Sequence, residues 1–159
     1  MESGSIVEYI DRQKIMCAVI LEVKNTRVRL LTENNREVKL SAGRLLHEDK
    51  ARIDLSMGRD NLVNTLKGVA DKRKALIRQV DIKDLWEVLN TEQVWIDLET
   101  MTEFCFPDSP SGDHESATIR AFFDDRLYFK FNLDKFFPNS AEKVARIVAQ
   151  RQEEARQKR

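Results

Sequence analysis

The first 58 residues alternate between hydrophobic and polar positions in short runs, which is the pattern of β-strands. The links between the runs are of hairpin length, and the runs comprise residues 5–10, 15–23, 26–32 and 36–40. In the third run Val28 and Leu30 share one face, whereas Arg27 and Arg29 share the other. Four or five short antiparallel strands must close or nearly close to bury a face. We therefore predict a small β-barrel, SH3-like or OB-like, over residues 1–58, with 51–56 as the candidate last strand.

Residues 59–80 have the spacing of an amphipathic helix that links the barrel to the rest of the chain. One face is apolar and contains Leu62, Leu66, Val69, Leu76, Ile77 and Val80. Another face carries Lys67, Lys74 and Arg78, with Asp71 among them. Arg73 falls in the middle of the apolar face. Either its side chain extends to the surface, or the helix breaks near Gly68, and the pattern leaves both alternatives open.

Residues 81–138 predict a recognisable order of elements. Asp81 and Asp97 are candidate N-caps, and a turn-rich loop precedes the third helix. The elements are a helix (81–89), a strand (93–96), helices (98–104 and 114–125) and two strands (126–131 and 135–138). Helix, strand, helix, helix and hairpin is the winged helix-turn-helix arrangement. The chain is thus expected to be α+β, with flanking helices around this domain.

A last helix is predicted in residues 139–159, with Ser140 as its N-cap. Its apolar stripe ends at Ala149, and the final ten residues are almost wholly polar. No cap signal ends this pattern. Either the segment is a solvated tail, or it is a connector to another domain.

Aromatic residues are concentrated in the second half. All eight Phe, both Trp and one Tyr lie between Trp86 and Phe137. A surface for stacking nucleic-acid bases needs exposed rings interleaved with Arg and Lys. Residues 81–137 instead hold thirteen acidic and five basic side chains, with Asp124 and Asp125 among the rings. We therefore expect these rings to form a protein core, and we expect the acidic side chains around them to repel phosphate.

The charges along the chain identify a better candidate surface. The 27 basic and 27 acidic residues cancel overall, but residues 59–80 hold six basic and two acidic side chains. The candidate phosphate contacts are Lys67, Lys72, Lys74 and Arg78, joined by Lys24, Arg27 and Arg29 on the barrel. An ordinary solvated helix face is the alternative. The candidate DNA-reading helix, 114–125, offers only His114 and Arg120, so we do not expect specific DNA binding.

Signals for catalysis are missing from the sequence. Cys17 and Cys105 each stand alone in apolar runs and are interpreted as buried free thiols in a reducing compartment. His47 and His114 have no metal-ligand spacing, and no Gly-rich phosphate loop occurs. No apolar run approaches the roughly 20 residues of a membrane span, and no signal peptide is apparent. We expect a cytoplasmic protein whose 159 residues are not catalytic by themselves.

Several stretches resemble the N-terminal region of RNase II (RNB) family exoribonucleases of bacteria and organelles. They are "GSIVEYIDRQKIMCAVILEV", "DIKDLWEVL", "FFDDRLYFKF" and "FFPNSAEKVARI", and the resemblance covers nearly the whole chain. It implies a small barrel and a winged helix that engage RNA and pass it to a catalytic domain downstream. That domain hydrolyses RNA 3′→5′ with Mg²⁺ held by clustered aspartates, a signature that is missing here.

The resemblance therefore implies an accessory region without a cofactor of its own. Its expected partners are single-stranded RNA, bound with little sequence preference, and its own catalytic domain. Two alternatives stay open, a protein–protein docking module and a winged-helix DNA-binding protein.

Overall fold

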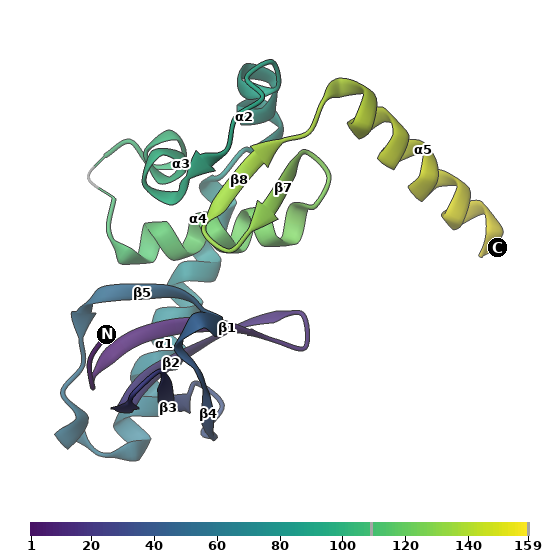
Figure 1. The fold of residues 1–159 in the computed structure, drawn as a ribbon. Coiled ribbons are helices and arrows are strands. Elements are labelled where there is room, and N and C mark those ends of the chain that lie inside the picture. Colours follow the sequence, from purple (N-terminus) through teal and green to yellow (C-terminus); the bar gives the residue numbers. More distant parts are fainter. Residues whose placement is uncertain (109, 159) are drawn as a thin grey trace.

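The computed structural model describes residues 1–108 and 110–158. Ser109, in the predicted turn-rich loop, and Arg159, at the end of the predicted last helix, lie outside the described residues. The architecture is α+β (Figure 1). A five-stranded antiparallel sheet has the order β4-β3-β2-β1-β5. Its strands are β1 (Ser5–Asp11), β2 (Lys14–Lys24), β3 (Arg27–Thr32), β4 (Glu37–Ser41) and β5 (Leu45–Arg52).

The last strand of the sheet is not the one that we predicted. β5 overlaps residues 51–56 only at Ala51 and Arg52, and Leu55–Met57 form a short 3₁₀ helix, η2. The sequence of β5 contains no β-branched residue, so its composition is a poor strand signal. Pairing with β1 creates the strand, which shows that tertiary context overrides local propensity here.

The two faces of the sheet are buried in different ways. One face carries Ile6, Cys17, Val19 and Leu31 and packs against a helix. The other face packs mainly against itself, with Val7, Ile20, Leu30 and Leu40 in one cluster. The sheet is therefore strongly curled. In the described part of the chain no ladder joins β4 to β5 (connected through η1, Ala42–Arg44), so the sheet stays open rather than closing into a hydrogen-bonded barrel.

Helix α1 (Arg59–Leu76) runs unbroken through Gly68 and continues into a 3₁₀ turn, η3 (Ile77–Gln79). Leu62, Val63, Leu66 and Ala70 bury its apolar face against the sheet. Both alternatives that we considered for Arg73 are wrong. The helix does not break, and the Arg73 side chain does not reach the surface, because carboxylates surround it in the interior.

The second half contains the predicted order of helices and strands. Asp81 and Asp97 cap α2 and α3 as expected, each accepting a bond from a backbone N–H three residues on. A three-stranded sheet has the order β6-β8-β7. The elements are α2 (Ile82–Leu89), β6 (Ile96–Asp97), α3 (Leu98–Cys105), α4 (Gly112–Asp125), β7 (Phe129–Asn132) and β8 (Lys135–Pro138). In Figure 1, α4 lies between the β7–β8 hairpin and the five-stranded sheet.

Most of the aromatic rings form a core, as the sequence indicated. Phe122, Phe129 and Phe136 are fully buried, and the Phe122 ring contacts both of the others with centroid distances of 4.9 Å. Trp95 and Phe104 are exceptions, because about half of each side chain is exposed. The prediction of a protein core is therefore confirmed for the Phe cluster, but it does not hold for every ring between Trp86 and Phe137.

The last helix, α5 (Ala141–Gln157), projects away from the rest of the molecule (Figure 1). Ser140 caps it as predicted, accepting a bond of 3.2 Å from the Lys143 N–H. Val144 is its buried residue. None of the helices in the described ranges combines the length and the apolar character needed to cross a lipid bilayer.

Candidate nucleic-acid interface

Three of the predicted cations lie exposed along the linking helix. Lys67 and Lys74 are on α1 and Arg78 is in η3, and their spacing of seven and four residues puts them on one side. We call these three residues the α1 cation face. Among the residues that the structure describes, none of the three forms an ion pair. Their charges are therefore available to a polyanion.

Lys72 lies apart from this face because it has an acidic neighbour. Its Nζ is 3.1 Å from Oδ2 of Asp113 at the start of α4, although 64% of the Lys72 side chain stays exposed. An exposed pair of this kind is weak and easily exchanged. Lys72 contributes positive potential, but less than the members of the α1 cation face.

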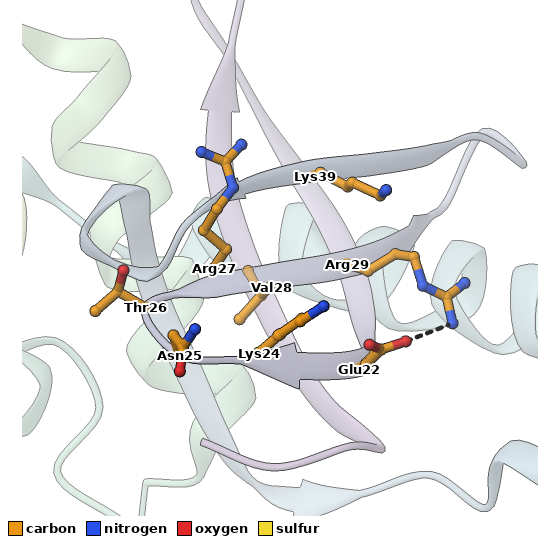
Figure 2. A pocket seen from close by; sticks show the side chains of 8 residues that line it. All are labelled: Glu22, Lys24, Asn25, Thr26, Arg27, Val28, Arg29 and Lys39. Atoms are coloured by element: carbon orange, nitrogen blue, oxygen red, sulfur yellow. Dashed lines mark hydrogen bonds and ion pairs between the residues drawn. The ribbon is translucent and has the colours of Figure 1, made fainter.

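Lys24, Arg27 and Arg29 gather around the turn between β2 and β3, where they line a pocket of about 480 Å³ with Lys39 (Figure 2). We call these four residues the turn cluster. Arg29 is already neutralised, because it lies 2.6 Å from Glu37 and 3.4 Å from Glu22. Sequence reasoning missed Lys39, although the β3–β4 hairpin register, which pairs Arg29 with Lys39, was the signal for it.

The α1 cation face and the turn cluster do not form one site. Lys74 lines a second groove, of about 360 Å³, together with Lys14 from the β1–β2 hairpin, Arg120 and Asp124. This groove shares no lining residue with the pocket of the turn cluster. Lys14 is the cation that the structure brings to the helix, and its strand alone carried no signal of that placement.

A buried ion network joins the sheet, α1 and α4. The Arg73 guanidinium lies 3.2 Å from Glu8, 2.9 Å from Asp49 and 2.9 Å from Asp113. Arg120 on α4 also pairs with Glu8, its Nε donating to Oε2 over 3.1 Å, and Ser116 donates to the same carboxylate. We refer to Glu8, Asp49, Arg73, Asp113 and Arg120 as the buried ion network.

The network sets the charge state of Glu8. Burial of this carboxylate raises its pKa, but the charges of Arg120 and Arg73 and the Ser116 hydrogen bond outweigh burial, so the net pKa is lowered. Burial likewise opposes the charge of Arg73, whose pKa is nevertheless raised by Glu8 and Asp113. Glu8 and Arg73 are therefore both charged at neutral pH. The ion pairs of the network join β1 and β5 of the sheet to α1 and α4, and so they connect the two halves of the chain.

The candidate DNA-reading helix has its polar side chains occupied. Arg120 is buried against Glu8. His114 completes the capping box of α4, with its Nδ1 accepting a 3.0 Å bond from the Ser111 N–H. Because α4 packs against α1 and β5, these side chains make contacts within the protein and do not face a DNA groove.

Catalytic chemistry finds little support in the described residues. No group of three or more His, Cys, Asp or Glu side chains in residues 1–108 and 110–158 is placed to hold a metal ion. Both cysteines are free thiols. Burial raises the pKa of Cys17 to about 12 and that of Cys105 to about 11. Neither is therefore a thiolate nucleophile at neutral pH.

The fold is similar to part of a known nuclease. No protein-family model and no curated protein sequence matches the chain. The structure is similar to the crystal structure of an active-site mutant of the Dss1 exoribonuclease from Candida glabrata, with a TM-score of 0.63 and 9% identity. The match covers 87% of this chain and 24% of the exoribonuclease chain. This chain thus has the fold of about a quarter of that protein.

Proposed function

We propose that this chain is an RNA-binding accessory region of an RNase II-type exoribonuclease and guides single-stranded RNA to a hydrolytic domain. The observation that carries the proposal is the likeness to part of an exoribonuclease over 87% of the chain. On this proposal the curled sheet is a small barrel, SH3-like or OB-like, that stops short of closure. Residues 81–138 are a winged helix with β7–β8 as the wing, and Mg²⁺ belongs to the hydrolytic domain, downstream of α5.

The α1 cation face is proposed to make the main phosphate contacts. Its three side chains are exposed along α1 and η3, whereas Arg29 of the turn cluster is held by two glutamates. Contacts to phosphate carry no sequence information. The binding is therefore expected to be weak, salt-sensitive and tolerant of sequence.

Fluorescence anisotropy with a labelled single-stranded RNA, at several salt concentrations, tests this function. Replacing Lys67, Lys74 and Arg78 together by Glu should abolish detectable binding. For the wild-type chain the log of the affinity should fall linearly with log salt, by about 0.7 for each phosphate neutralised on a single strand. A matched variant with Lys83, Lys135 and Arg151 changed to Glu alters net charge equally and should retain binding.

Circular dichroism of each variant verifies that the fold is intact. Unchanged affinity in a folded Lys67, Lys74 and Arg78 variant would remove the α1 cation face from the mechanism. A wild-type chain that binds no RNA at physiological salt would contradict the proposed function itself and favour the docking-module alternative.

A further inference from the structure

A groove between the β7–β8 hairpin and the start of α5 carries positive charge. The net negative charge of residues 81–137 conceals it. The volume of the groove is about 380 Å³, and Arg126, Lys130 and Lys143 contribute to its lining. None of the described residues that line it is acidic. We call it the wing groove. Although residues 81–137 hold more acidic than basic side chains, the acidic ones lie elsewhere.

An aromatic platform forms one wall of the wing groove. Trp95 lines the groove and is 50% exposed, although Trp is among the side chains that gain most from burial. Its ring packs on Phe137 with a centroid distance of 5.3 Å, so it is held in place. The Nζ of Lys130 lies 5.6 Å from the centroid of the same Phe137 ring. A fixed, exposed ring beside a cation is the arrangement that stacks a nucleobase.

Two polar features of the groove lack a partner among residues 1–108 and 110–158. Burial of Lys143 and the neighbouring charges of Lys130 and Arg146 lower the pKa of Lys143. Within the described ranges, Arg126, Lys130 and Lys143 form no ion pair. Asn139 lines the groove and is only 4% exposed. Its Nδ2 donates to the Leu127 carbonyl over 2.8 Å, but among the described residues its buried Oδ1 has no hydrogen-bond partner.

A buried acceptor without a donor is costly, and native structures rarely keep one unless a ligand or water completes it. A bound nucleotide offers both missing partners. Its phosphate is the anion that the three cations lack. Its amino and hydroxyl groups are donors for the Asn139 Oδ1, which the side chain must first turn toward the groove because this atom is buried. A protein ligand would need an acidic group, a hydrogen-bond donor and a flat group that stacks on Trp95 at one spot to do the same.

We propose that the wing groove is a second contact for single-stranded RNA, in which one base stacks on Trp95 and the adjoining phosphates lie against Arg126, Lys130 and Lys143. This inference rests on the proposed function and extends it to a site outside the α1 cation face. It also reverses our sequence-based expectation that the ring-rich segment repels phosphate. Trp95, which stands outside the main aromatic run, was the residue that the expectation overlooked.

The first test removes the stacking ring. The Trp95→Ala variant should bind a short single-stranded RNA roughly 5- to 150-fold more weakly, because stacking on an aromatic side chain contributes about 1–3 kcal/mol per base. Trp95→Phe keeps a stacking ring and should retain most of the affinity. Phe104→Ala removes another half-exposed ring, on α3 and outside the groove, and should leave binding unchanged.

The second test removes the charges. Changing Lys130 and Lys143 together to Gln should reduce the slope of log affinity against log salt by about 1.4, that is, about 0.7 for each of two phosphates. A merely structural role of these lysines would not change the slope. The Lys83→Gln, Lys135→Gln pair, outside the groove, is the matched control.

The outcomes separate this inference from the proposed function. Weaker binding in the groove variants, with folded controls that bind normally, supports the wing groove whether or not the α1 cation face also contributes. If the Lys67, Lys74 and Arg78 variant loses binding while Trp95→Ala and the Lys130, Lys143 pair bind like the wild type, the wing groove is overturned and the proposed function stands. A wild-type chain without RNA affinity overturns both.

Discussion

The guanidinium of Arg73 reaches three carboxylates at once, from β1, β5 and the start of α4. Each of these charges loses hydration in the interior, and their mutual attraction offsets that loss only while every partner is present. Arg73 is therefore the residue on which the junction depends. Removing it leaves Glu8 with Arg120 and Ser116, leaves Asp113 with only the exposed Lys72, and takes away the Asp49 ion pair.

Replacement of Arg73 by Met should lower the free energy of unfolding by about 3–5 kcal/mol, because it leaves buried charge without a partner. Urea denaturation followed by circular dichroism measures the loss. Lys74→Met, one residue along and exposed, should change stability by less than about 0.5 kcal/mol. A loss below about 1 kcal/mol for Arg73→Met would mean that the network adds little to the fold.

The lowered pKa of Glu8 makes the free energy of unfolding depend on pH in the acid range. Its pKa in the folded chain is lowered from the ordinary value of 4.5, so between the two values the unfolded chain binds more protons. Stability from Glu8 is then fully present above pH 4.5 and is lost as pH falls through the folded pKa. The lowered pKa values of Asp113 and Glu115 act in the same direction.

Urea denaturation from pH 7 to pH 3 tests this dependence. The wild-type chain should lose stability on acidification below about pH 4.5. Glu8→Gln should be less stable at pH 7 and should lose less on acidification, because it has no proton to bind at this site. Equal pH profiles for the two proteins would exclude Glu8 as a source of the acid sensitivity.

At the scale of elements, glycine placement gives a matched pair of predictions on two helices. Gly68 lies within α1, and a Cβ added there would meet nothing within 4 Å. Gly68→Ala should therefore raise stability by about 0.5–1 kcal/mol through helix propensity. A Cβ on Gly112, at the start of α4, would lie 2.5 Å from the Asp49 carboxylate that holds Arg73.

Gly112→Ala should lower stability despite the higher helix propensity of Ala, because Asp49 must move away from Arg73. Thermal denaturation of the two variants beside the wild-type chain measures both signs in one experiment. A stabilising Gly112→Ala would mean that Asp49 can shift without cost, and that its contact with Arg73 is weak.

The sequence predicted those elements whose own pattern determines them. α2 and α3 have caps and apolar spacing in their residues, and the β7–β8 hairpin has its alternation. β5 was missed because its strand character comes from its neighbour. Two residues of the buried ion network do not fit their local pattern. Arg73 is a cation on an apolar helix face, and Glu8 is an anion between Ile6 and Ile10 on one strand face. Only the fold shows that they meet.

The candidate site also has one part that the sequence could predict and one part that it could not. The grouping of the α1 cation face could be predicted because its members recur at intervals of seven and four residues along α1 and η3. The wing groove could not, since it combines Trp95, Lys130 and Lys143 from three separate segments. A net charge summed over residues 81–137 averages opposite surfaces, so it says nothing of the potential at any one of them.

At the scale of the whole molecule, the curled sheet and the helical half share α1 and the buried ion network. α1 fills the sheet core with its first turns and presents Arg73 to α4 from a later one. Unfolding either half exposes the charges that the other half compensates. This coupling favours one cooperative transition over two independent ones.

Two probes can separate these cases, because each reports on one half. Trp86 and Trp95 both lie in the helical half, whereas Cys17 is fully buried in the sheet, where its raised pKa of about 12 keeps it unreactive until it is exposed. In a Cys105→Ala background, tryptophan fluorescence and labelling of Cys17 should give the same urea midpoint. With Arg73→Met added, the helical half should unfold at lower urea than the sheet, since the ionic link is lost while the apolar contacts of α1 remain. If the two probes gave separate midpoints in the protein that keeps Arg73, the two halves would fold independently. An RNA that occupied both the α1 cation face and the wing groove would then contact two bodies rather than one.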